Sequence, residues 1–247
     1  MKASAIEFRL RMAIMVVIVT LGFWSPWIEI WGWGSRGSLL EWLALEVSRL
    51  GLLRFTYATP AVIILGSLIA LLGAVLRVWG AAYLGYGTVH HGQMQAGTVM
   101  ADGPYRYVRN PLYLGGWCMM AAMAFIMPPT GALFTMTLLT VFLLRLILGE
   151  EAFLSGQLGE PYREYLHAVP RLFPRLRAGL PAAGHKPHWM ISFLTELNPI
   201  GVFITMAFLS WSYDNELMLK GILISFGASL VTRALFMRVK QKANSQE

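Results

Sequence analysis

The stretch that decides the fold runs from Pro60 to Leu84 and reads PAVIILGSLIALLGAVLRVWGAAYL. Its one charged residue is Arg77, and the other positions are apolar, small or weakly polar. An α-helix needs about 20 consecutive apolar residues to cross the hydrocarbon core of a bilayer, and this stretch is longer. We therefore expect a membrane-spanning helix here. A lone span has no core of its own, so the fold depends on how many similar segments flank it.

The composition of the whole chain agrees with a membrane protein. Of its 247 residues, 56% are hydrophobic and only 13% are charged. Soluble domains carry about 25% charged residues, so the composition argues against a soluble enzyme and also against intrinsic disorder. The nine Trp, nine Tyr and thirteen Phe residues suit a protein with two water–lipid borders. The single cysteine, Cys118, excludes an internal disulfide and a thiolate zinc site, and we expect no metal site.

Five further segments have the apolar character of membrane-spanning helices. They are Met12–Trp31, Pro111–Met127, Ala132–Leu148, His188–Ser212 and Leu217–Met237. Pro128–Gly131 predicts a tight turn that joins two of them in a hairpin, and Asn198-Pro199 predicts a bend in the His188–Ser212 span. Leu39–Leu53 is amphipathic and is expected to lie on the membrane surface. Together these segments predict an all-α, polytopic transmembrane bundle of about six spans, within a range of about five to seven.

The distribution of basic residues orients these spans. With both termini in the cytoplasm, most of the 20 Lys and Arg residues fall on the inner side, as the positive-inside rule requires. The net charge of +7 thus reflects topology, and we expect no nucleic-acid partner. The Met12–Trp31 segment has the basic flank of a signal peptide but no small-residue cleavage site, so we expect it to be retained. Both long polar loops, Gly85–Asn110 and Gly149–Pro187, then lie on the cytoplasmic face.

The first of these loops ends in the sequence Gly103-Pro104-Tyr105-Arg106-Tyr107-Val108-Arg109-Asn110-Pro111-Leu112-Tyr113-Leu114-Gly115. Its Asn110-Pro111 step is typical of a helix start, with Asn as the N-cap and Pro in the first helical position. Arg109 lies beside the free amides of that helix start, where an arginine makes an anion site. His90 and His91, at the start of the loop, are interpreted first as solvated or capping residues, with a direct functional role as the alternative.

The second loop opens with Glu150-Glu151 at the end of the Ala132–Leu148 span. A helix C-terminus disfavours negative charge, so a pair of solvated end charges is one interpretation. In the other, one carboxylate faces the bundle while its neighbour faces water, because successive helical side chains point about 100° apart. Farther along, Tyr162 and Tyr165 share one helix face. The basic segment Val169–Leu176 is expected to run along anionic membrane lipids.

Together the two loops resemble a known family. The Gly103–Gly115 stretch is similar to the GPYRYxRHPxYxG motif of isoprenylcysteine carboxyl methyltransferases and their phospholipid methyltransferase relatives. A second motif of that family, EExxL…FGxxYxxYxxxVPR, is similar to Glu150-Glu151 followed by Leu154, Gly159, Tyr162, Tyr165 and Val169-Pro170-Arg171. The resemblance covers residues 60–178, which we interpret as a methyltransferase core between an N-terminal region, 1–59, and a C-terminal two-span extension, 179–247. Asn110 replaces the family's usual His, and Leu158 its usual Phe.

The resemblance implies S-adenosylmethionine as methyl donor, bound on the cytoplasmic side by these two loops. Glu150 or Glu151 can pair with the ammonium group of the donor, tyrosines can lie against its sulfonium or adenine, and Arg109 can hold a carboxylate. The catalytic candidates are Arg109, Glu150 and Arg163, the last for acceptor binding. The cofactor-binding candidates are His91, Val99, Gly103, Pro104, Tyr105, Tyr107, Arg109, Asn110, Pro111, Tyr113, Glu150, Glu151, Tyr162 and Tyr165.

The resemblance also implies a lipophilic acceptor, a small molecule or a lipidated substrate, drawn from the bilayer. We favour a carboxylate, as in isoprenylcysteine O-methylation, because it is ionised at neutral pH and needs no general base. A thiol or a phospholipid amine is the alternative, and an amine needs a base such as His90, His91 or Glu151. A second alternative is an NADPH-dependent, sterol-reductase-like oxidoreductase, and a third is a catalytically silent scaffold. Glu196 is a further functional candidate because intramembrane charge is costly.

Overall fold

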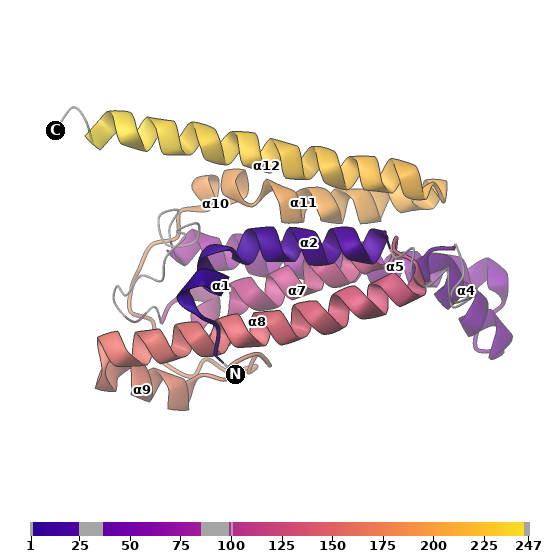
Figure 1. Ribbon diagram of the computed structural model, residues 1–247. Coiled ribbons are helices and arrows are strands. Elements are labelled where there is room, and N and C mark those ends of the chain that lie inside the picture. Colours follow the sequence, from indigo (N-terminus) through magenta and orange to yellow (C-terminus); the bar gives the residue numbers. More distant parts are fainter. Residues whose placement is uncertain (1, 25–36, 85–98, 100, 245–247) are drawn as a thin grey trace.

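The computed structural model describes residues 2–24, 37–84, 99 and 101–244, and every regular element in these ranges is a helix (Figure 1). The α-helices are α1 Ala5–Arg9, α2 Arg11–Phe23, α4 Leu39–Arg49, α5 Phe55–Leu84, α7 Pro111–Ala124, α8 Pro129–Leu158, α9 Glu160–Ala168, α10 Trp189–Thr195, α11 Leu197–Ile204 and α12 Asn215–Asn244. Short 3₁₀ turns at Gly103–Arg106 and Ser210–Ser212 and a π-helical turn at Thr205–Leu209 complete them. The predicted all-α fold class is thus confirmed.

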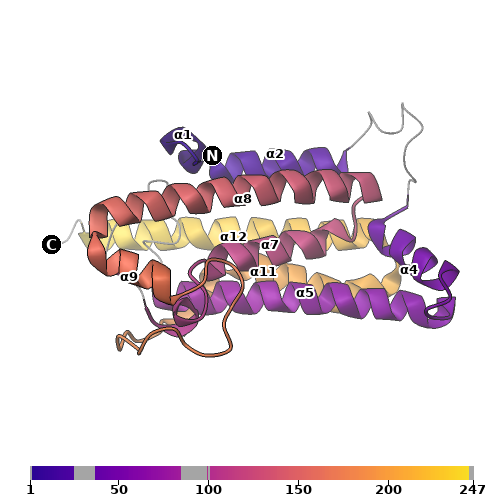
Figure 2. The same ribbon diagram turned by 90° about the horizontal axis from the view of Figure 1, so that it is seen from below.

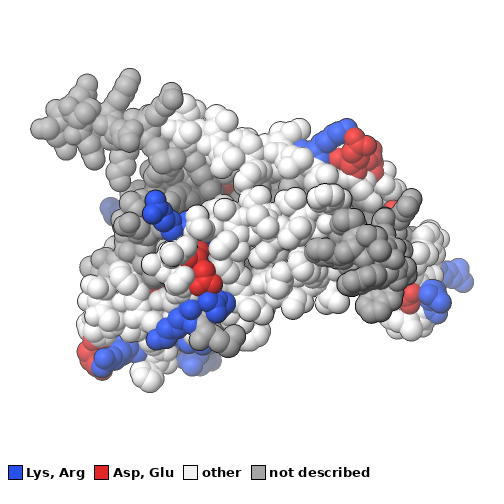
Figure 3. All heavy atoms as spheres, viewed as in Figure 1, with Lys and Arg blue, Asp and Glu red and all other residues white. Residues whose placement is uncertain are grey.

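Two helices, α5 and α8, are long and apolar enough to cross a membrane, and α10 with the segment Leu197–Ser212 makes a third if this bent pair counts as one span. Large apolar side chains are exposed along α5, as on a lipid-facing helix: Ile64, Leu65, Leu68, Leu72 and Val75. On the face shown in Figure 3, charged side chains gather toward the two ends of the bundle, with a largely uncharged band between them. These features support a membrane protein. The total of about six spans, with both termini in the cytoplasm, stays a prediction.

The helices form a bundle around α5 and α7, the pair with the most extensive contact. α7 also packs on α8, α2 lies along α8, and α11 packs between α5 and α12 (Figures 1 and 2). The predicted hairpin of α7 and α8 is therefore present, but its turn lies between Ala124 and Pro129 and not over Pro128–Gly131, because Pro129 begins α8. Glycines let α5 and α7 approach closely, since a Cβ on Gly73 would lie 2.9 Å from the backbone oxygen of Gly115. The main apolar core joins α4, α5, α7, α11 and α12 through buried residues such as Ile63, Ala122 and Met206.

Helix α8 extends to Leu158, well beyond the predicted end at Leu148. Good helix formers continue past its apolar part, and Gly159, with φ +64°, ends it. Glu150 and Glu151 therefore lie inside a helix, and their predicted position at a helix C-terminus was wrong. They are not a solvated pair, because Glu151 is buried and Glu150 is half-buried.

The first predicted span also differs from the structure. Helix α2 ends at Phe23 rather than at Trp31, and by itself it is shorter than a membrane crossing. A physical reason lies in the sequence just beyond, because Pro26 disfavours helical backbone at the residue before it. The rest of the predicted span, from residue 25, lies outside the described residues.

The fifth predicted span bends at a different place from the one expected. The chain turns by 67° at the break between α10 and α11, where Glu196 lies, and not at Asn198-Pro199. Pro199 lies in the first turn of α11, where the N–H that proline lacks has no helical partner to lose. The amphipathic helix predicted over Leu39–Leu53 is present as α4, and it buries Leu40 and Ala44.

The described ends of the two long loops lie together at the end of the bundle that carries α9 (Figure 2). The backbone N–H of Arg109 donates to the carbonyl of Pro170 at 2.9 Å, and that of Arg175 donates to the carbonyl of Tyr107 at 3.1 Å. These bonds fix the two motifs against each other, so both contribute to one site.

Asp102 anchors a later part of the second loop. Its carboxylate accepts hydrogen bonds from the backbone N–H groups of Ala183 at 2.8 Å, Gly184 at 3.3 Å and His185 at 2.9 Å. The Nδ1 atom of His185 lies 2.6 Å from the same carboxylate. Burial alone would raise the pKa of Asp102, but the bonds from His185, Gly184 and Ala183 outweigh it and lower the pKa below its usual 3.8.

The Asp102→Asn variant is expected to release this segment. Hydrogen bonds to a charged group contribute about 1.5–3 kcal/mol, so backbone amide exchange at residues 183–185 should accelerate about ten- to a hundredfold. Because the pKa of Asp102 is lowered on folding, its contribution is present above pH 3.8 and is lost as the pH falls below that value. Hydrogen-exchange mass spectrometry, corrected for intrinsic rates, checks both effects. Unchanged protection in the variant at neutral pH would contradict the anchoring role.

Candidate functional site

Glu151 lies at the centre of a buried ion-pair cluster. Its Oε1 is 3.1 Å from Nη1 of Arg109, and its Oε2 is 2.8 Å from Nη2 of Arg171. The amide of Asn110 donates to the same carboxylate at 3.3 Å. The hydrogen bonds with Glu151 raise the pKa of Arg171 above its usual value, and two cations beside one carboxylate offset the cost of burying it. The structure thus brings together Arg109, Asn110 and Glu151, which the sequence predicted for one site.

The anion site expected at Arg109 is therefore filled by the chain's own Glu151. Asn110 precedes α7 as predicted, but its side chain makes no capping hydrogen bond to that helix. Its amide donates instead to Glu151 and, at 3.2 Å, to the carbonyl of Arg171. The capping prediction was wrong. A cap needs the side-chain oxygen to accept from a helix N–H, whereas the bonds donated by Nδ2 hold the Asn110 side chain against Glu151 and the second loop.

Glu150, the next residue in α8, lines a different space from Glu151. It borders a cavity of about 310 Å³, and its Oε2 accepts a 2.7 Å hydrogen bond from the hydroxyl of Tyr113, which lines the same cavity. Small-molecule sites have volumes of about 300–1,000 Å³, so the cavity is at the small end of that range. One carboxylate of the pair thus faces the interior of the bundle, as the second interpretation expected, whereas its neighbour is paired rather than solvated.

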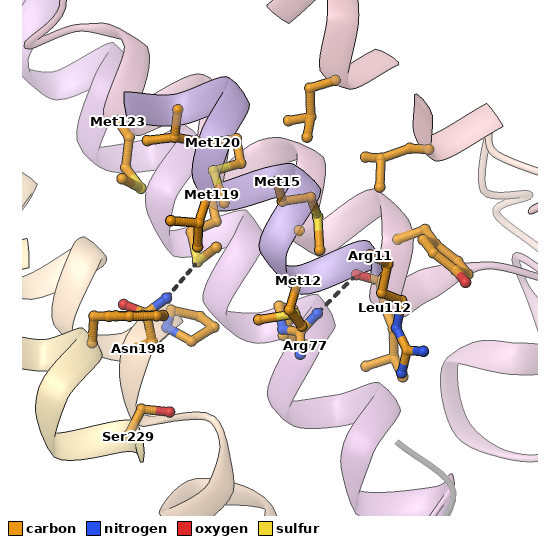
Figure 4. A pocket seen from close by; sticks show the side chains of 18 of the residues that line it. Arg11, Met12, Met15, Arg77, Leu112, Met119, Met120, Met123, Asn198 and Ser229 are labelled. Carbon is orange, nitrogen blue, oxygen red and sulfur yellow. Dashed lines mark hydrogen bonds between the residues drawn. The ribbon is translucent and has the colours of Figure 1, made fainter. Parts of the chain in front are cut away.

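The cavity wall is mostly apolar and is built from α1, α2, α5, α7, α8, α11 and α12. Methionines form much of it: Met12, Met15, Met119, Met120 and Met123 (Figure 4). Methionine is flexible and fills irregular space, so such a wall can adapt to a hydrocarbon chain. Four charged side chains also reach the cavity, namely Arg11, Arg77, Glu150 and Glu196. The cavity therefore suits an amphiphile with one apolar and one polar part.

A buried ion pair of Arg77 and Glu196 is part of this wall. The Nε atom of Arg77 lies 2.6 Å from Oε2 of Glu196, and Nη2 lies 2.9 Å from Oε1. The side chain of Glu196 is fully buried and that of Arg77 is 19% exposed. Arg77 also donates from Nη1 to the carbonyl of Leu112 at 3.4 Å (Figure 4). The pair joins α5 to the break between α10 and α11, so Glu196 has a structural partner inside the bundle.

The Glu196→Gln variant is expected to unfold more easily than the wild type. Removing one partner of a buried ion pair costs about 3–5 kcal/mol, because the other charge is left uncompensated. Thermal unfolding of the detergent-purified protein measures the effect. The double variant Arg77→Met, Glu196→Met removes both charges and should recover most of the loss. A single variant as stable as the wild type would show that the pair does not support the fold.

Three predicted tyrosines form a second cluster beside the first. The rings of Tyr162 and Tyr165 lie 5.8 Å apart on one face of α9, as predicted, and the hydroxyl of Tyr165 donates to the carbonyl of Tyr105 at 2.9 Å. Burial raises the pKa of all three phenols, so they are protonated at neutral pH and available as neutral donors. Val99 and Ala101 pack against this cluster.

Two buried polar atoms in this region have no hydrogen-bond partner among the described residues. They are the hydroxyl of Tyr105 and Nε of Arg109. Buried polar atoms are nearly always paired in native proteins, so an unpaired donor in a candidate site is a place where a ligand can bind. Both residues belong to the motif of the first loop.

The remaining predicted residues of the first motif have structural positions close by. Gly103 and Pro104 begin the 3₁₀ turn that carries Tyr105, and Gly103 has φ +53°, which favours glycine. The ring of Tyr107 lies 6.1 Å from that of Trp79 on α5. Pro111 occupies the first position of α7.

Two predicted site residues are not brought to these clusters by the described structure. The side chain of Arg163 is 62% exposed on α9 and is ion-paired with Glu160 at 3.4 Å, away from the cavity lining. Its role in acceptor binding stays a prediction. His91, with His90, lies outside the described residues. Within the described ranges, no three His, Cys, Asp or Glu side chains are grouped so as to hold a metal ion.

Sequence reasoning missed the roles of two residues at this site. Arg171 was noted only as part of a motif, and Arg77 only as the one charge in an apolar span. An isolated arginine within a membrane-spanning stretch is itself a signal, because such a charge needs a partner. The partner could not be named from the sequence because Glu196 is 119 residues away.

Comparison with known proteins gives a family match for part of the chain. Residues 61–160 match the phospholipid methyltransferase family. This region contains α7 and α8, and with them Arg109, Tyr113, Glu150 and Glu151, whereas α10, α11 and α12 lie outside it. No curated protein and no solved structure matches the chain. The match agrees with the resemblance to membrane methyltransferases that the two loop motifs indicated.

Proposed function

We propose that the protein transfers a methyl group from S-adenosylmethionine to the carboxylate of a lipophilic acceptor drawn from the bilayer. The observation that carries the proposal is the cavity, in which a methionine-rich apolar wall meets Glu150, Tyr113 and Arg77. The hydrocarbon part of an amphiphile would lie against the apolar wall, and its polar end would lie at the charged groups. The family match supplies the reaction class.

The described residues fit the chemistry of S-adenosylmethionine. Arg109 Nε and the Tyr105 hydroxyl are buried donors without a described partner, and they can bind the carboxylate and a hydroxyl or ring nitrogen of the ligand. Glu150 is a carboxylate at the cavity and can pair with an ammonium group. When bound, S-adenosylmethionine supplies an electrophilic methyl group. Glu151 is already paired with Arg109 and Arg171, so we assign it the part of a positioning residue that holds Arg109.

The residues of this chain then have to orient the acceptor and keep water away. A carboxylate acceptor is ionised at neutral pH, so no proton has to be removed, and alignment carries the rate. A hydrocarbon chain bound against the apolar wall would displace water from the cavity. Arg77 is our candidate for orienting the carboxylate of the acceptor. Its Nε and Nη2 are paired with Glu196, but its Nη1 makes only a long 3.4 Å hydrogen bond to the carbonyl of Leu112 and can donate to a ligand.

A phospholipid amine is the second candidate acceptor, and one observation favours it. Glu150 lines the cavity beside Tyr113, and a carboxylate in that position can accept the proton that amine methylation releases. A thiol would also need a base. The sterol-reductase-like alternative loses its support, because the family match is to methyltransferases.

Transfer of labelled methyl groups to a defined set of lipids tests the proposal. The purified protein is incubated with methyl-labelled S-adenosylmethionine and, separately, with a prenylated cysteine, a long-chain thiol and phosphatidylethanolamine. We expect label in the prenylated cysteine that alkali releases, since a methyl ester is hydrolysed whereas thioethers and methylamines are not. Alkali-stable label in phosphatidylethanolamine would show that the methyl acceptor is an amine and not a carboxylate. Absence of label from all three would contradict the proposed acceptors.

A further inference from the structure

The cavity wall includes a polar patch that the methyltransferase region does not supply. Asn198 on α11 and Ser229 on α12 both line the cavity, and both lie outside residues 61–160. Figure 4 shows them together on the side of the cavity opposite Met12 and Met15. Their wall neighbours from α12 are apolar: Ile222, Leu223 and Phe226. Residues of the C-terminal extension thus place two neutral polar side chains beside apolar wall residues of α12.

Ser229 is buried, and its hydroxyl has no hydrogen-bond partner among the described residues. Serine and threonine inside a helix commonly donate to the carbonyl four residues before them. In this structure Ser67, Thr140, Ser155 and Thr232 do so. Ser229 does not, although Thr232 on the same helix donates to the carbonyl of Ala228. A buried hydroxyl left unpaired is costly, so its presence at a cavity indicates a ligand that pairs with it.

The side chain of Asn198 is held in place, but its hydrogen-bonding capacity is not fully used. Its Oδ1 accepts a 3.3 Å hydrogen bond from the hydroxyl of Ser225, and its Nδ2 points to the sulfur of Met119 at 3.6 Å. A thioether is a weak hydrogen-bond acceptor. The amide nitrogen of Asn198 can therefore still donate a strong hydrogen bond to an oxygen atom of a ligand. The amide and the Ser229 hydroxyl together offer donors and an acceptor but no charge.

We propose that Asn198 and Ser229 form a subsite for a neutral oxygen function, a hydroxyl or a carbonyl, on the hydrocarbon chain of the acceptor. This inference rests on the proposed function in so far as the cavity holds the acceptor. Because Asn198 and Ser229 belong to the C-terminal extension, residues 179–247, this subsite would make the extension a determinant of substrate selection. The acceptor would then be an oxygenated lipid rather than a plain hydrocarbon chain with one polar end.

Binding of matched fatty acids to the purified full chain tests the subsite without requiring turnover. The probes are octadecanoic acid and a set of its monohydroxy derivatives that differ in the position of the hydroxyl group along the chain. Calorimetry measures their dissociation constants for the wild type, for Ser229→Ala and for Thr232→Ala. Thr232 lies on the same helix and donates to its own helix backbone, so it is the matched control.

We expect at least one hydroxylated acid to bind the wild type about three- to tenfold more tightly than octadecanoic acid, as one good hydrogen bond allows. Ser229→Ala should abolish that preference, and Thr232→Ala should keep it. Equal binding of all the acids to the wild type, or a preference that survives in Ser229→Ala, would overturn the subsite. If the preference is present but no methyl group is transferred to any acceptor, the subsite stands and the proposed reaction fails.

Discussion

Replacing Glu150 with glutamine is expected to lower kcat/KM for methyl transfer about a hundredfold while leaving the unfolding temperature unchanged. Glutamine has the same shape and its carbonyl oxygen can still accept the 2.7 Å hydrogen bond from Tyr113, so the local packing survives. The negative charge at the cavity is lost, and with it the pairing that we propose for the ammonium group of the donor. Steady-state kinetics and thermal unfolding of the same preparation measure the two quantities.

The matched control is Glu151→Gln, the same change at the adjacent residue. The side chain of Glu151 is only 8% exposed and compensates two arginines, so this variant should unfold at a lower temperature. The expected loss is about 3 kcal/mol, at the low end for a buried pair because Arg171 is 42% exposed. A Glu150→Gln variant with wild-type activity would contradict our assignment of the two carboxylates. So would a Glu151→Gln variant that is fully stable.

Replacing Arg109 with alanine is expected to reduce methyl transfer about a hundred- to a thousandfold. The variant removes the unpartnered Nε donor that we assign to the ligand carboxylate, and it also removes one of the two cations that hold Glu151. We expect the dissociation constant for S-adenosylhomocysteine to rise in parallel with the loss of activity, because the missing contact is made to the ligand itself. Calorimetry and kinetics on one preparation check both.

Arg171→Ala separates the two roles of Arg109. Arg171 is the other cation beside Glu151, but its side chain is 42% exposed and both Nε and Nη2 are bonded to Glu151. We expect this variant to lose stability yet to keep most of its affinity for S-adenosylhomocysteine. Equal losses of affinity in Arg109→Ala and Arg171→Ala would mean that Arg109 acts only by holding Glu151.

Features that depend on local sequence could be predicted, and those that depend on distant contacts could not. The apolar stretch within α5 and the start of α7 at Pro111 follow from hydropathy and proline chemistry, and both were correct. The end of α8 was missed because hydropathy marks only the lipid-facing part of a helix. The polar turns beyond Leu148 are good helix formers and continue to Leu158.

At the candidate site, too, local motifs could be predicted and distant contacts could not. The motifs indicated Arg109 and the two glutamates, but which glutamate faces the cavity depends on α8 continuing through both. The wall at Glu196, Asn198 and Ser229 could not be predicted, because it forms only when α11 packs against α5 and α7 and α12 packs against α11. Hydropathy and local motifs do not indicate which distant helices pair.

Calorimetric binding of S-adenosylmethionine to the detergent-purified protein, with NADPH as the control ligand, is the decisive experiment for a methyl-donor site on this chain. We expect saturable binding of S-adenosylmethionine and S-adenosylhomocysteine with a dissociation constant on the order of micromolar, weakened at least tenfold in Glu150→Gln and absent for NADPH. Folded protein that binds NADPH and neither adenosyl ligand would show that the chain has no such site.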